Sequence, residues 1–463
     1  MSQTTSTIFV QIASYRDPEL IPTLRDLIGS AAFPDRLRIV VCWQHGPDEH
    51  VGIFLSQQFL QWELQPGSPF NLHTFTFGGA RIELIDVPHE QSQGACWARN
   101  QIQQRYRDEA YTLQLDSHHR FVANWDTAVI GMLEQLRPRS PKPLLTAYLS
   151  FYTPPAPDTP FIKKEEPALG MSFDRFSRGG PILFRSFTLP NWRTLHEPVP
   201  ARFYSGHFAF ADGAFAREVQ HDPDYFFHGE EISIAVRAFT HGYDLYHPHR
   251  TLAWHEYVRD GRRKIWDDHD KTARDDGRVR LTWSERNDLS MARNRVLFGM
   301  EPEAGDTELS RNDPRGSAYG FGTARSLADY EVYAGISFRD RAVQPEVLAH
   351  APPDLGAVRP GATLDRATLR RSNDVRVVAH HTSIDVAACP RATRCTVQAL
   401  RDDGTVLHED DADIEAARQH CHGEWFDRDL AFMSDLGVKP AAFRIELRDA
   451  HGETLKAFTS AVG

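Results

Sequence analysis

This 463-residue chain lacks long apolar runs, paired cysteines and an excess of positive charge. No apolar stretch approaches the roughly 20 residues of a membrane helix, and residues 1–7 have neither the basic nor the apolar segment of a secretory signal. Five scattered cysteines do not form a disulfide framework. The net charge of -11 disfavours general binding to nucleic acid. We therefore expect a soluble, cytoplasmic protein with no membrane and no nucleic-acid partner.

The chain does have the composition of an ordinary globular protein, 41% hydrophobic and 25% charged, and is long enough for two or three domains. Its first segment shows a strand pattern at 7–13, a helical pattern at 18–31 and a second strand pattern at 37–43. A strand, a helix and a strand in this order form a βαβ unit, which implies a parallel sheet. The predicted fold class is therefore α/β.

Polar residues follow the first predicted strand at its carboxyl end, where open α/β sheets bind ligands. The sequence there is Ser14-Tyr15-Arg16-Asp17-Pro18. Its hydroxyl, aromatic, guanidinium and carboxylate groups suit a nucleotide base and ribose. The alternative for Asp17 is a helix N-cap with Pro18 at the first helical position. That alternative leaves Tyr15 and Arg16 free for a ligand.

A second polar group, Asp116-Ser117-His118, follows the apolar run 111–115. In an extended chain alternate side chains point the same way, so Asp116 and His118 can converge on one divalent cation while Ser117 faces elsewhere. The alternative is a strand-to-turn junction with solvated polar side chains. The triplet therefore indicates a candidate metal site, and the neighbouring sequence decides between the two interpretations.

That context is a supersecondary pattern. After a strand pattern, Gly94 opens a helical pattern that carries Arg99 and Asn100 and runs to about residue 109. The order strand, glycine turn, helix, strand and Asp-x-His resembles the glycosyltransferase A fold. This resemblance implies a Rossmann-like mixed sheet flanked by helices, in which Arg99, Asn100 and Asp116 handle a nucleotide-sugar diphosphate and its metal.

Longer stretches resemble one family with that fold. They are residues 8–18, 42–44, 113–118, 227–232 and 255–257. Together they resemble the UDP-GlcNAc-dependent polypeptide GlcNAc-transferases, which include enzymes that modify hydroxyproline on a cytoplasmic ubiquitin-ligase adaptor and the protist mucin-type enzymes. The resemblance covers about residues 7–338. It implies UDP-GlcNAc as the donor, contacts from Gln44 to that donor, and a protein hydroxyl as the acceptor.

The resemblance also implies the metal ligands. Asp116 and His118 would bind the cation together with His255, which matches the late histidine that completes the site in related transferases; His247 and His249 stay as alternatives. Oxygen and nitrogen ligands around a phosphate-bound cation fit Mn²⁺, with Mg²⁺ as the alternative. Such a cation would neutralise the charge that develops on the diphosphate as the sugar–phosphate bond breaks.

Four further positions are assigned to the donor site. Glu230 matches the Gly-Glu carboxylate of the family and is expected to bind donor hydroxyls or orient the acceptor, with Glu231 as its partner. Helix capping is the alternative for both glutamates, since they begin an amphipathic helix. Gly206, in a strand expected over 204–210, would permit close backbone approach to the sugar. Arg259 is the best candidate to close over the diphosphate, and a solvated charge run is its alternative.

The C-terminal part shows a different pattern. After a catalytic domain at 1–340 and a proline-marked linker at 341–360, short alternating segments predict an all-β, sandwich-like domain at 361–463. Zinc binding is disfavoured there because no Cys-x-x-Cys pair occurs among the cysteine and histidine residues Cys389, Cys395, His420, Cys421 and His422. This domain could bind an acceptor, mediate self-association or cover the catalytic domain.

The sequence thus predicts a metal-dependent, retaining glycosyltransferase that moves GlcNAc from UDP-GlcNAc to a hydroxyl group. The acceptor is expected to be a polypeptide carrying threonine, serine or hydroxyproline. One alternative is a transferase that uses another UDP-sugar or a glycan acceptor. An alternative of a different class is a catalytically inert module that binds sugar or protein. Together the four residues Asp116, His118, Glu230 and His255 argue against inertness.

Overall fold

The computed structural model describes residues 6–154, 167–258, 261–303, 306 and 313–462. The chain forms two compact units. Unit 1 consists of Met1–Phe173, Phe184–Ala334 and His350–Ala362, and unit 2 consists of Asp174–Leu183, Gly335–Ala349 and Thr363–Gly463. Residues of the expected linker 341–360 therefore contribute to both units.

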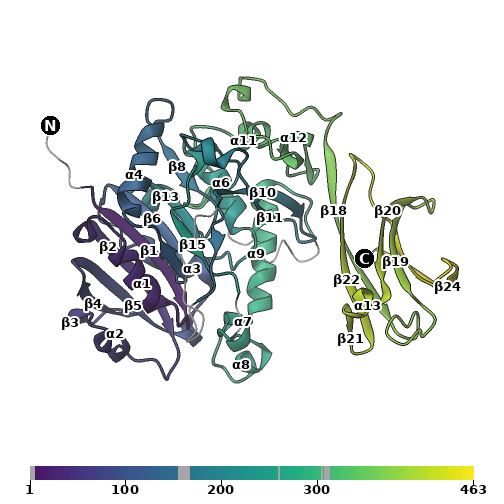
Figure 1. Ribbon diagram of the computed structural model, residues 1–463, viewed down its shortest axis with the longest axis horizontal. Helices are drawn as coiled ribbons and strands as arrows, with labels where there is room; N and C mark the ends of the chain where they lie inside the picture. Colours follow the sequence, from purple (N-terminus) through teal and green to yellow (C-terminus); the bar gives the residue numbers. More distant parts are fainter. Residues whose placement is uncertain (1–5, 155–166, 259–260, 304–305, 307–312, 463) are drawn as a thin grey trace. The chain divides into compact units, whose positions relative to one another are not determined.

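Unit 1 is built on one ten-stranded mixed sheet (Figure 1). The strand order is β12-β14-β8-β13-β6-β1-β2-β5-β4-β3. Strands β1, β2, β5 and β6 are parallel, whereas β13 runs antiparallel between β6 and β8. The strands are β1 (Ile8–Tyr15), β2 (Leu37–His45), β3 (Leu60–Gln65), β4 (Asn71–Phe77), β5 (Ala80–Pro88), β6 (Tyr111–Asp116), β8 (Pro143–Thr146), β12 (Val199–Pro200), β13 (Phe208–Asp212) and β14 (Asp244–His247).

Helices cover both faces of this sheet because alternate residues of its central strands are apolar on both sides. Ile8, Val10 and Ile12 of β1 pack in one cluster with α1 (Leu20–Gly29) and α4 (Trp125–Leu136). Phe9 of β1, pointing the other way, packs in a second cluster with α3 (Ala95–Gln103). The predicted α/β class with a mixed sheet and flanking helices is confirmed.

Unit 1 also contains the long helices α6 and α9, the β10–β11 hairpin and several shorter helices. They are α2 (Gly52–Ser56), β10 (Leu169–Phe176), β11 (Ile182–Thr188), α5 (Phe215–Glu218), α6 (Glu230–Thr240), α7 (Ile265–Asp268), α8 (Lys271–Asp275), α9 (Trp283–Phe298) and α11 (Leu327–Ala334); the tip of the β10–β11 hairpin belongs to unit 2. None of the helices that the structure describes has the length and hydropathy needed to span a lipid bilayer.

A small three-stranded sheet lies beside the carboxyl end of β6. Its order is β7 (His119–Phe121), β15 (Ala253–His255) and β9 (Ser150–Phe151). In the antiparallel pairing of β7 with β15, His255 lies opposite His119. This register brings a residue from late in the chain next to the Asp-x-His triplet.

Two expected elements end elsewhere than predicted. The helix expected to reach about residue 109 ends at Gln103. The strand expected over 204–210 begins only at Phe208. In the preceding loop the backbone N–H of Ser205 donates to Thr146 Oγ1 and that of Gly206 donates to the Glu231 carboxylate. Because side chains take these backbone donors, the loop does not extend the strand ladder.

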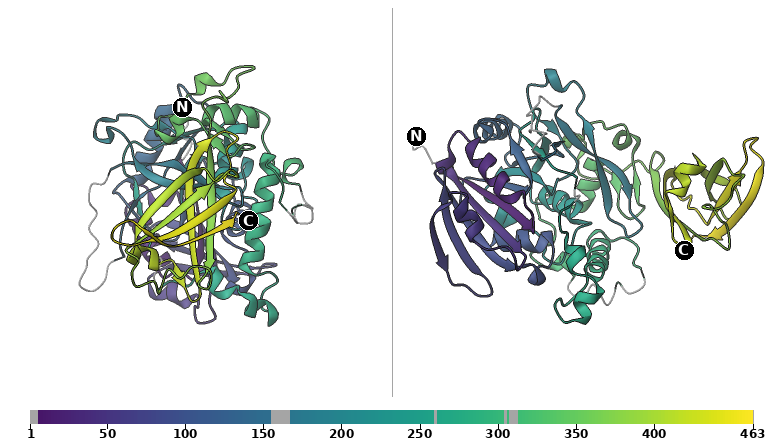
Figure 2. Two further views of the ribbon diagram at one scale, coloured as in Figure 1. Left: turned by 90° about the vertical axis from the view of Figure 1, so that its right-hand side faces the viewer. Right: turned by 60° about the horizontal axis from the view of Figure 1, so that its bottom comes forward.

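Unit 2 has an all-β core, as the sequence predicts (Figure 2). Apolar side chains from a five-stranded and a four-stranded sheet form its cluster, including Val377, Leu430, Val397 and Ile445. The sheets are β16-β17-β18-β22-β21 and β20-β19-β23-β24, composed of β16 (Ile336–Ser337), β17 (Ala342–Val343), β18 (Arg370–His380), β19 (Arg394–Leu400), β20 (Val406–Asp413), β21 (Cys421–His422), β22 (Trp425–Asp435), β23 (Ala442–Arg448) and β24 (Thr454–Ala461), with the helices α12 (Pro345–Leu348) and α13 (Ile414–Arg418).

Candidate active site and metal centre

A pocket of about 410 Å³ lies at the carboxyl ends of β1 and β6 in unit 1. Its walls come from the N-terminus of α3, the loop before β13, the start of α6, the end of β15 and residues 262–266. Parallel strands end at the same edge of a sheet, so the loops that follow them converge there. The pocket is thus the place where the sequence predicts ligand binding.

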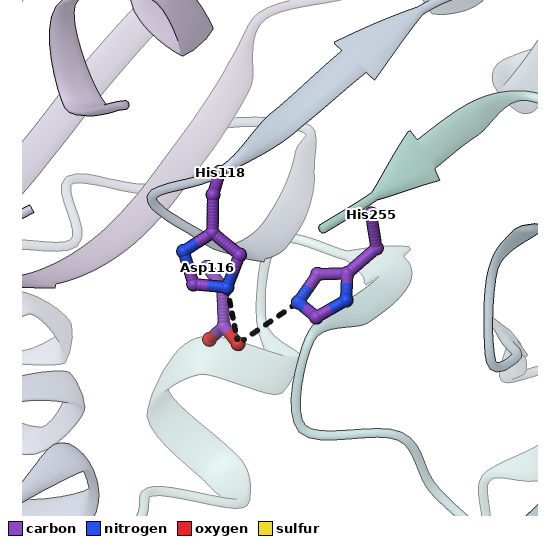
Figure 3. A group of neighbouring side chains, drawn as sticks. All are labelled: Asp116, His118 and His255. Carbon is purple, nitrogen blue, oxygen red and sulfur yellow. Dashed lines mark hydrogen bonds and ion pairs between the residues drawn. The ribbon is translucent and has the colours of Figure 1, made fainter. Parts of the chain in front are cut away.

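Asp116, His118 and His255 all line this pocket and lie together as one group (Figure 3). Asp116 Oδ2 lies 3.8 Å from His118 Nε2 and 3.4 Å from His255 Nε2. His118 Nε2 is buried and has no hydrogen-bond partner. A buried nitrogen without a partner, beside a carboxylate and a second imidazole, matches the donors that divalent transition metals bind in proteins. The three residues therefore fit a metal ion.

The two alternative histidines lie outside this group. His247 is held by backbone, since Nδ1 lies 2.8 Å from the carbonyl oxygen of Thr146 and Nε2 lies 3.3 Å from the N–H of Met171. His249 follows β14, and its Nδ1 is buried without a hydrogen-bond partner. Of the three candidates, only His255 is brought to Asp116 and His118 by the fold.

Arg99 links Asp116 to Glu230. Its Nη2 donates to Asp116 Oδ1 over 2.7 Å, and its Nη1 forms a short ion pair with Glu230 Oε1. Burial acts to raise the pKa of Asp116, but the His255 contact and the Arg99 charge hold that pKa well below its usual range. Asp116 is therefore a carboxylate at neutral pH, as a metal ligand must be.

Glu230 lines the pocket with both oxygens already engaged. Besides Arg99, Oε1 contacts His221 Nε2 at 2.9 Å, and Oε2 accepts from Cys96 Sγ over 3.3 Å. Burial would raise its pKa, yet Arg99 and His221 lower the value to about 2. Glu230 thus remains ionised and well held, which suits fixing the electrostatics of the pocket better than accepting a proton.

Gly206 allows the loop before β13 to approach this ion pair. A Cβ atom at this position would lie 3.2 Å from Arg99 Nη1 and 3.3 Å from Glu230 Oε1. Both side chains are buried and held by each other, so they cannot readily move aside. A larger residue would therefore press on the Arg99–Glu230 pair, which is a packing reason for the glycine.

Glu231 has a different environment from its neighbour. Its Oε1 accepts from the Gly206 N–H and its Oε2 from the Tyr148 hydroxyl, each over 2.8 Å. Burial raises the pKa of Glu231 to about 7, and the Glu230 charge adds to this effect against the hydrogen bonds. A pocket carboxyl group that titrates near neutrality can both accept and donate a proton.

The raised pKa of Glu231 predicts a pH-dependent stability. Between its ordinary value of 4.5 and about 7, the folded protein holds a proton that the unfolded chain has released. The free energy of unfolding therefore falls by up to about 3 kcal/mol as the pH rises through this window. Glu231→Gln is expected to remove that fall, measured by urea unfolding at pH 4.5, 5.5, 6.5 and 7.5. Equal pH dependence in the variant and in wild type would contradict the assignment.

The structure distributes the other expected donor-site residues unevenly. Gln44 lines the pocket, donates from Nε2 to the Ser14 carbonyl oxygen and accepts from Ser92 Oγ. Ser14 itself is a buried residue of β1. Asn100 faces away, because its Nδ2 donates to the carbonyl oxygen of His221. Arg259 lies outside the described residues.

Tyr15 and Arg16 are not free, unlike the expectation. The Tyr15 hydroxyl donates to Asp268 Oδ2 over 2.9 Å, and Arg16 Nη1 donates to both oxygens of Asp268. Tyr15 lines the pocket, whereas Arg16 turns toward Asp48 as well. A carboxylate from α7 thus orders the end of β1. Sequence spacing did not indicate this contact because the partners are more than 250 residues apart.

Three pocket residues escaped the sequence analysis. His207 stacks on His255 with ring centroids 4.2 Å apart, and burial together with His255 holds its pKa well below the usual range. Tyr148 holds Glu231, and Arg262 enters the pocket from the segment after β15. His207 directly follows Gly206, so its position beside an expected sugar-pocket residue could have indicated it. Tyr148 carried none, since it lies in an irregular stretch.

A second group of metal-type ligands lies in unit 2. It consists of His380, His381 and Glu424, and two of the three are exposed. The zinc set considered from the sequence, which involves residues 389–422, does not form such a group among the described residues. The group Asp116, His118 and His255 is the more buried of the two and lines a cavity with other polar side chains.

Comparisons with known proteins agree with this description. The sequence model of the family described as Glycosyltransferase (GlcNAc) matches residues 7–340. No curated protein matches the chain. Among solved structures, GalNAc-T7 with UDP, GalNAc and Mn²⁺ is similar at a TM-score of 0.43 and 13% identity, over 68% of this chain and 55% of that one. This chain therefore spans about half of that solved chain.

Two other solved structures are also similar. Staphylococcus aureus TarS 1-349 in complex with UDP has a TM-score of 0.34 and 11% identity, covering 75% of this chain and 83% of that one. The mannosyltransferase PcManGT from Pyrobaculum calidifontis, in complex with GDP-Man and Mn²⁺, has a TM-score of 0.35 and 12% identity, covering 66% and 69% respectively.

Proposed function

Because the chain belongs to the glycosyltransferase family described as GlcNAc, we propose that it moves GlcNAc from UDP-GlcNAc to a hydroxyl group with a divalent metal ion. We further propose a retaining reaction, a polypeptide acceptor with threonine, serine or hydroxyproline, and a cytoplasmic location. The observation that carries the proposal is the group Asp116, His118 and His255, which lines a pocket.

The donor atoms indicate which metal is bound. Two imidazole nitrogens and one carboxylate oxygen suit Mn²⁺ better than Mg²⁺, which prefers oxygen ligands alone. When bound, the cation supplies charge neutralisation for the diphosphate that leaves the sugar. Asp116 ends β6 and His255 ends β15, while His118 lies in the two-residue connection between β6 and β7, so strands hold the ligand group on both sides.

Cations of the chain complete the diphosphate site in this proposal. Arg262 lines the pocket, its Nη2 forms an ion pair with Glu256 at 3.3 Å, and its Nε is buried without a hydrogen-bond partner. Unpaired guanidinium donors that face a cavity suit phosphate oxygens. Arg263 and Lys264 line the same wall. We therefore propose that Arg262 contacts the diphosphate, a role also expected of Arg259, which lies outside the described residues.

The two glutamates take separate parts. Glu230 fixes Arg99 and, through it, Asp116. Glu231, with its pKa near 7 and its carboxyl group lining the pocket, is placed to bind a sugar or acceptor hydroxyl and to hold its proton. This division follows from their contacts, since Glu230 pairs through Oε1 with Arg99 and His221, whereas Glu231 accepts from the Gly206 N–H and the Tyr148 hydroxyl.

The test is release of UDP from a panel of UDP-sugars by the purified protein. Turnover of UDP-GlcNAc is expected with Mn²⁺, slower turnover with Mg²⁺, and none after treatment with a chelator until Mn²⁺ is restored. Hydroxyl-bearing peptides and short glycans, added separately, decide between the acceptor classes. Turnover of a different UDP-sugar alone would overturn the donor assignment, and turnover that resists the chelator would overturn the metal assignment.

A further inference from the structure

Asp17 contacts the metal group directly, although it lies a hundred residues earlier in the sequence. It follows β1 and was expected to cap α1. Only its Oδ1 serves the helix, by accepting the Glu19 N–H over 2.9 Å. Its Oδ2 lies 2.7 Å from His118 Nδ1 and accepts from Ser117 Oγ over 2.6 Å. One oxygen of a buried carboxylate is therefore devoted to the Asp-x-His triplet.

The same oxygen also holds a pocket cation. Arg262 Nη1 donates to Asp17 Oδ2 over 2.9 Å, and this nitrogen lies 2.7 Å from His118 Nδ1. Arg262 Nη2 forms an ion pair with Glu256 at 3.3 Å. Asp17 Oδ2 is thus the point where a metal ligand and a cation from the opposite wall meet.

Two groups contact His118 Nδ1 and bear on the state of the imidazole: Asp17 Oδ2 and Arg262 Nη1, each at 2.7 Å. A carboxylate accepts hydrogen bonds only, and a guanidinium donates only. Arg262 can donate to an unprotonated Nδ1, whereas a metal bound through Nε2 requires the proton on Nδ1. In that state Asp17 Oδ2 accepts the Nδ1 proton, and Arg262 donates to the same oxygen. Nε2 is then left unprotonated, and this is the buried atom without a partner that faces Asp116. That tautomer is the one that can bind a metal through Nε2.

We propose that Asp17 is a positioning residue, which sets the tautomer and orientation of His118 and anchors Arg262 at the pocket wall. This inference rests on the proposed function, because it assigns His118 to a metal. It goes further because it makes the Asp17 carboxylate hold both the metal ligand His118 and the pocket cation Arg262. A carboxylate behind a metal-binding histidine typically changes metal affinity about 10–100-fold when it is removed.

The experiment compares wild type with Asp17→Asn by Mn²⁺ titration, in which electron paramagnetic resonance measures free Mn²⁺. The variant is expected to bind Mn²⁺ at least about tenfold more weakly. Arg262→Met keeps the Asp17–His118 contact and is expected to lose far less affinity. Asp126→Asn is the matched control, since Asp126 is also a buried aspartate that accepts backbone N–H groups, from Ala32 and Phe33.

A spectroscopic measurement separates positioning from general destabilisation. In ¹⁵N-histidine-labelled metal-free protein, His118 is expected to show a protonated Nδ1 and an unprotonated Nε2, and Asp17→Asn is expected to lose this single tautomer. Failure of wild type to bind Mn²⁺ would overturn the proposed metal, while the tautomer comparison would still decide the inference. An unchanged His118 tautomer in Asp17→Asn, or an equal loss of affinity in Asp126→Asn, would overturn the positioning role.

Discussion

Replacing Asp116 by alanine is expected to abolish measurable Mn²⁺ binding and to lower UDP-GlcNAc turnover at least about a thousandfold. Asp116 supplies the only carboxylate of the metal group, and its Oδ2 lies between the two imidazole nitrogens. A metal ion contributes several kcal/mol to charge stabilisation in such reactions, and each 1.36 kcal/mol corresponds to about a tenfold change in rate. The loss is therefore expected in the rate constant as well as in metal affinity.

The fold of the Asp116→Ala variant is expected to persist, because Arg99 keeps Glu230 as a partner. Circular dichroism and thermal unfolding check this point. Asp48→Ala is a suitable control, since that side chain is 78% exposed and its contact with Arg16 spans 3.8 Å. Wild-type turnover by Asp116→Ala, or a comparable loss in Asp48→Ala, would contradict the metal-site assignment.

Replacing Arg99 by alanine is expected to lower the free energy of unfolding by about 3–5 kcal/mol at neutral pH, because it leaves a buried charge without its partner. Arg99 is 5% exposed and lies between two carboxylates, Asp116 and Glu230. Without the guanidinium, the pKa of Glu230 is expected to rise from about 2. Protonation then relieves the unpaired charge, so the loss of stability should be smaller at pH 5 than at pH 7.

Urea unfolding at the two pH values measures both parts of this prediction. Arg139→Ala provides the comparison, since Arg139 and Glu197 form an ion pair of 2.9 Å between side chains that are 42% and 55% exposed. Exposed pairs of this kind contribute about 1 kcal/mol or less. A similar decrease in the free energy of unfolding in the two variants would contradict the prediction that the buried Arg99 ion pairs stabilise the fold more than an exposed pair does.

Much of the fold follows from local patterns in the sequence. The strands at 7–13 and 37–43 and the helix between them appear close to their predicted positions as β1, β2 and α1. The all-β pattern predicted for residues 361–463 likewise appears, with antiparallel pairing of β19 with β20 and of β23 with β24. Apolar periodicity and turn chemistry act over a few residues, so they can be read from the chain alone.

The sequence by itself also identified Asp116 and His118 as candidate metal ligands. Alternation along an extended chain does not describe the triplet, because Ser117 forms a bend and both Ser117 and His118 contact Asp17. Only the tertiary structure decided which distant partners they meet. His255 reaches Asp116 across 139 residues, and Asp17 reaches His118 across 101. Neither contact has a local signature, because strand order and the register of β15 on β7 determine it. Burial raises the pKa of both Glu230 and Glu231, and the contacts with Arg99 and His221 that lower only that of Glu230 likewise exist only once the chain has folded.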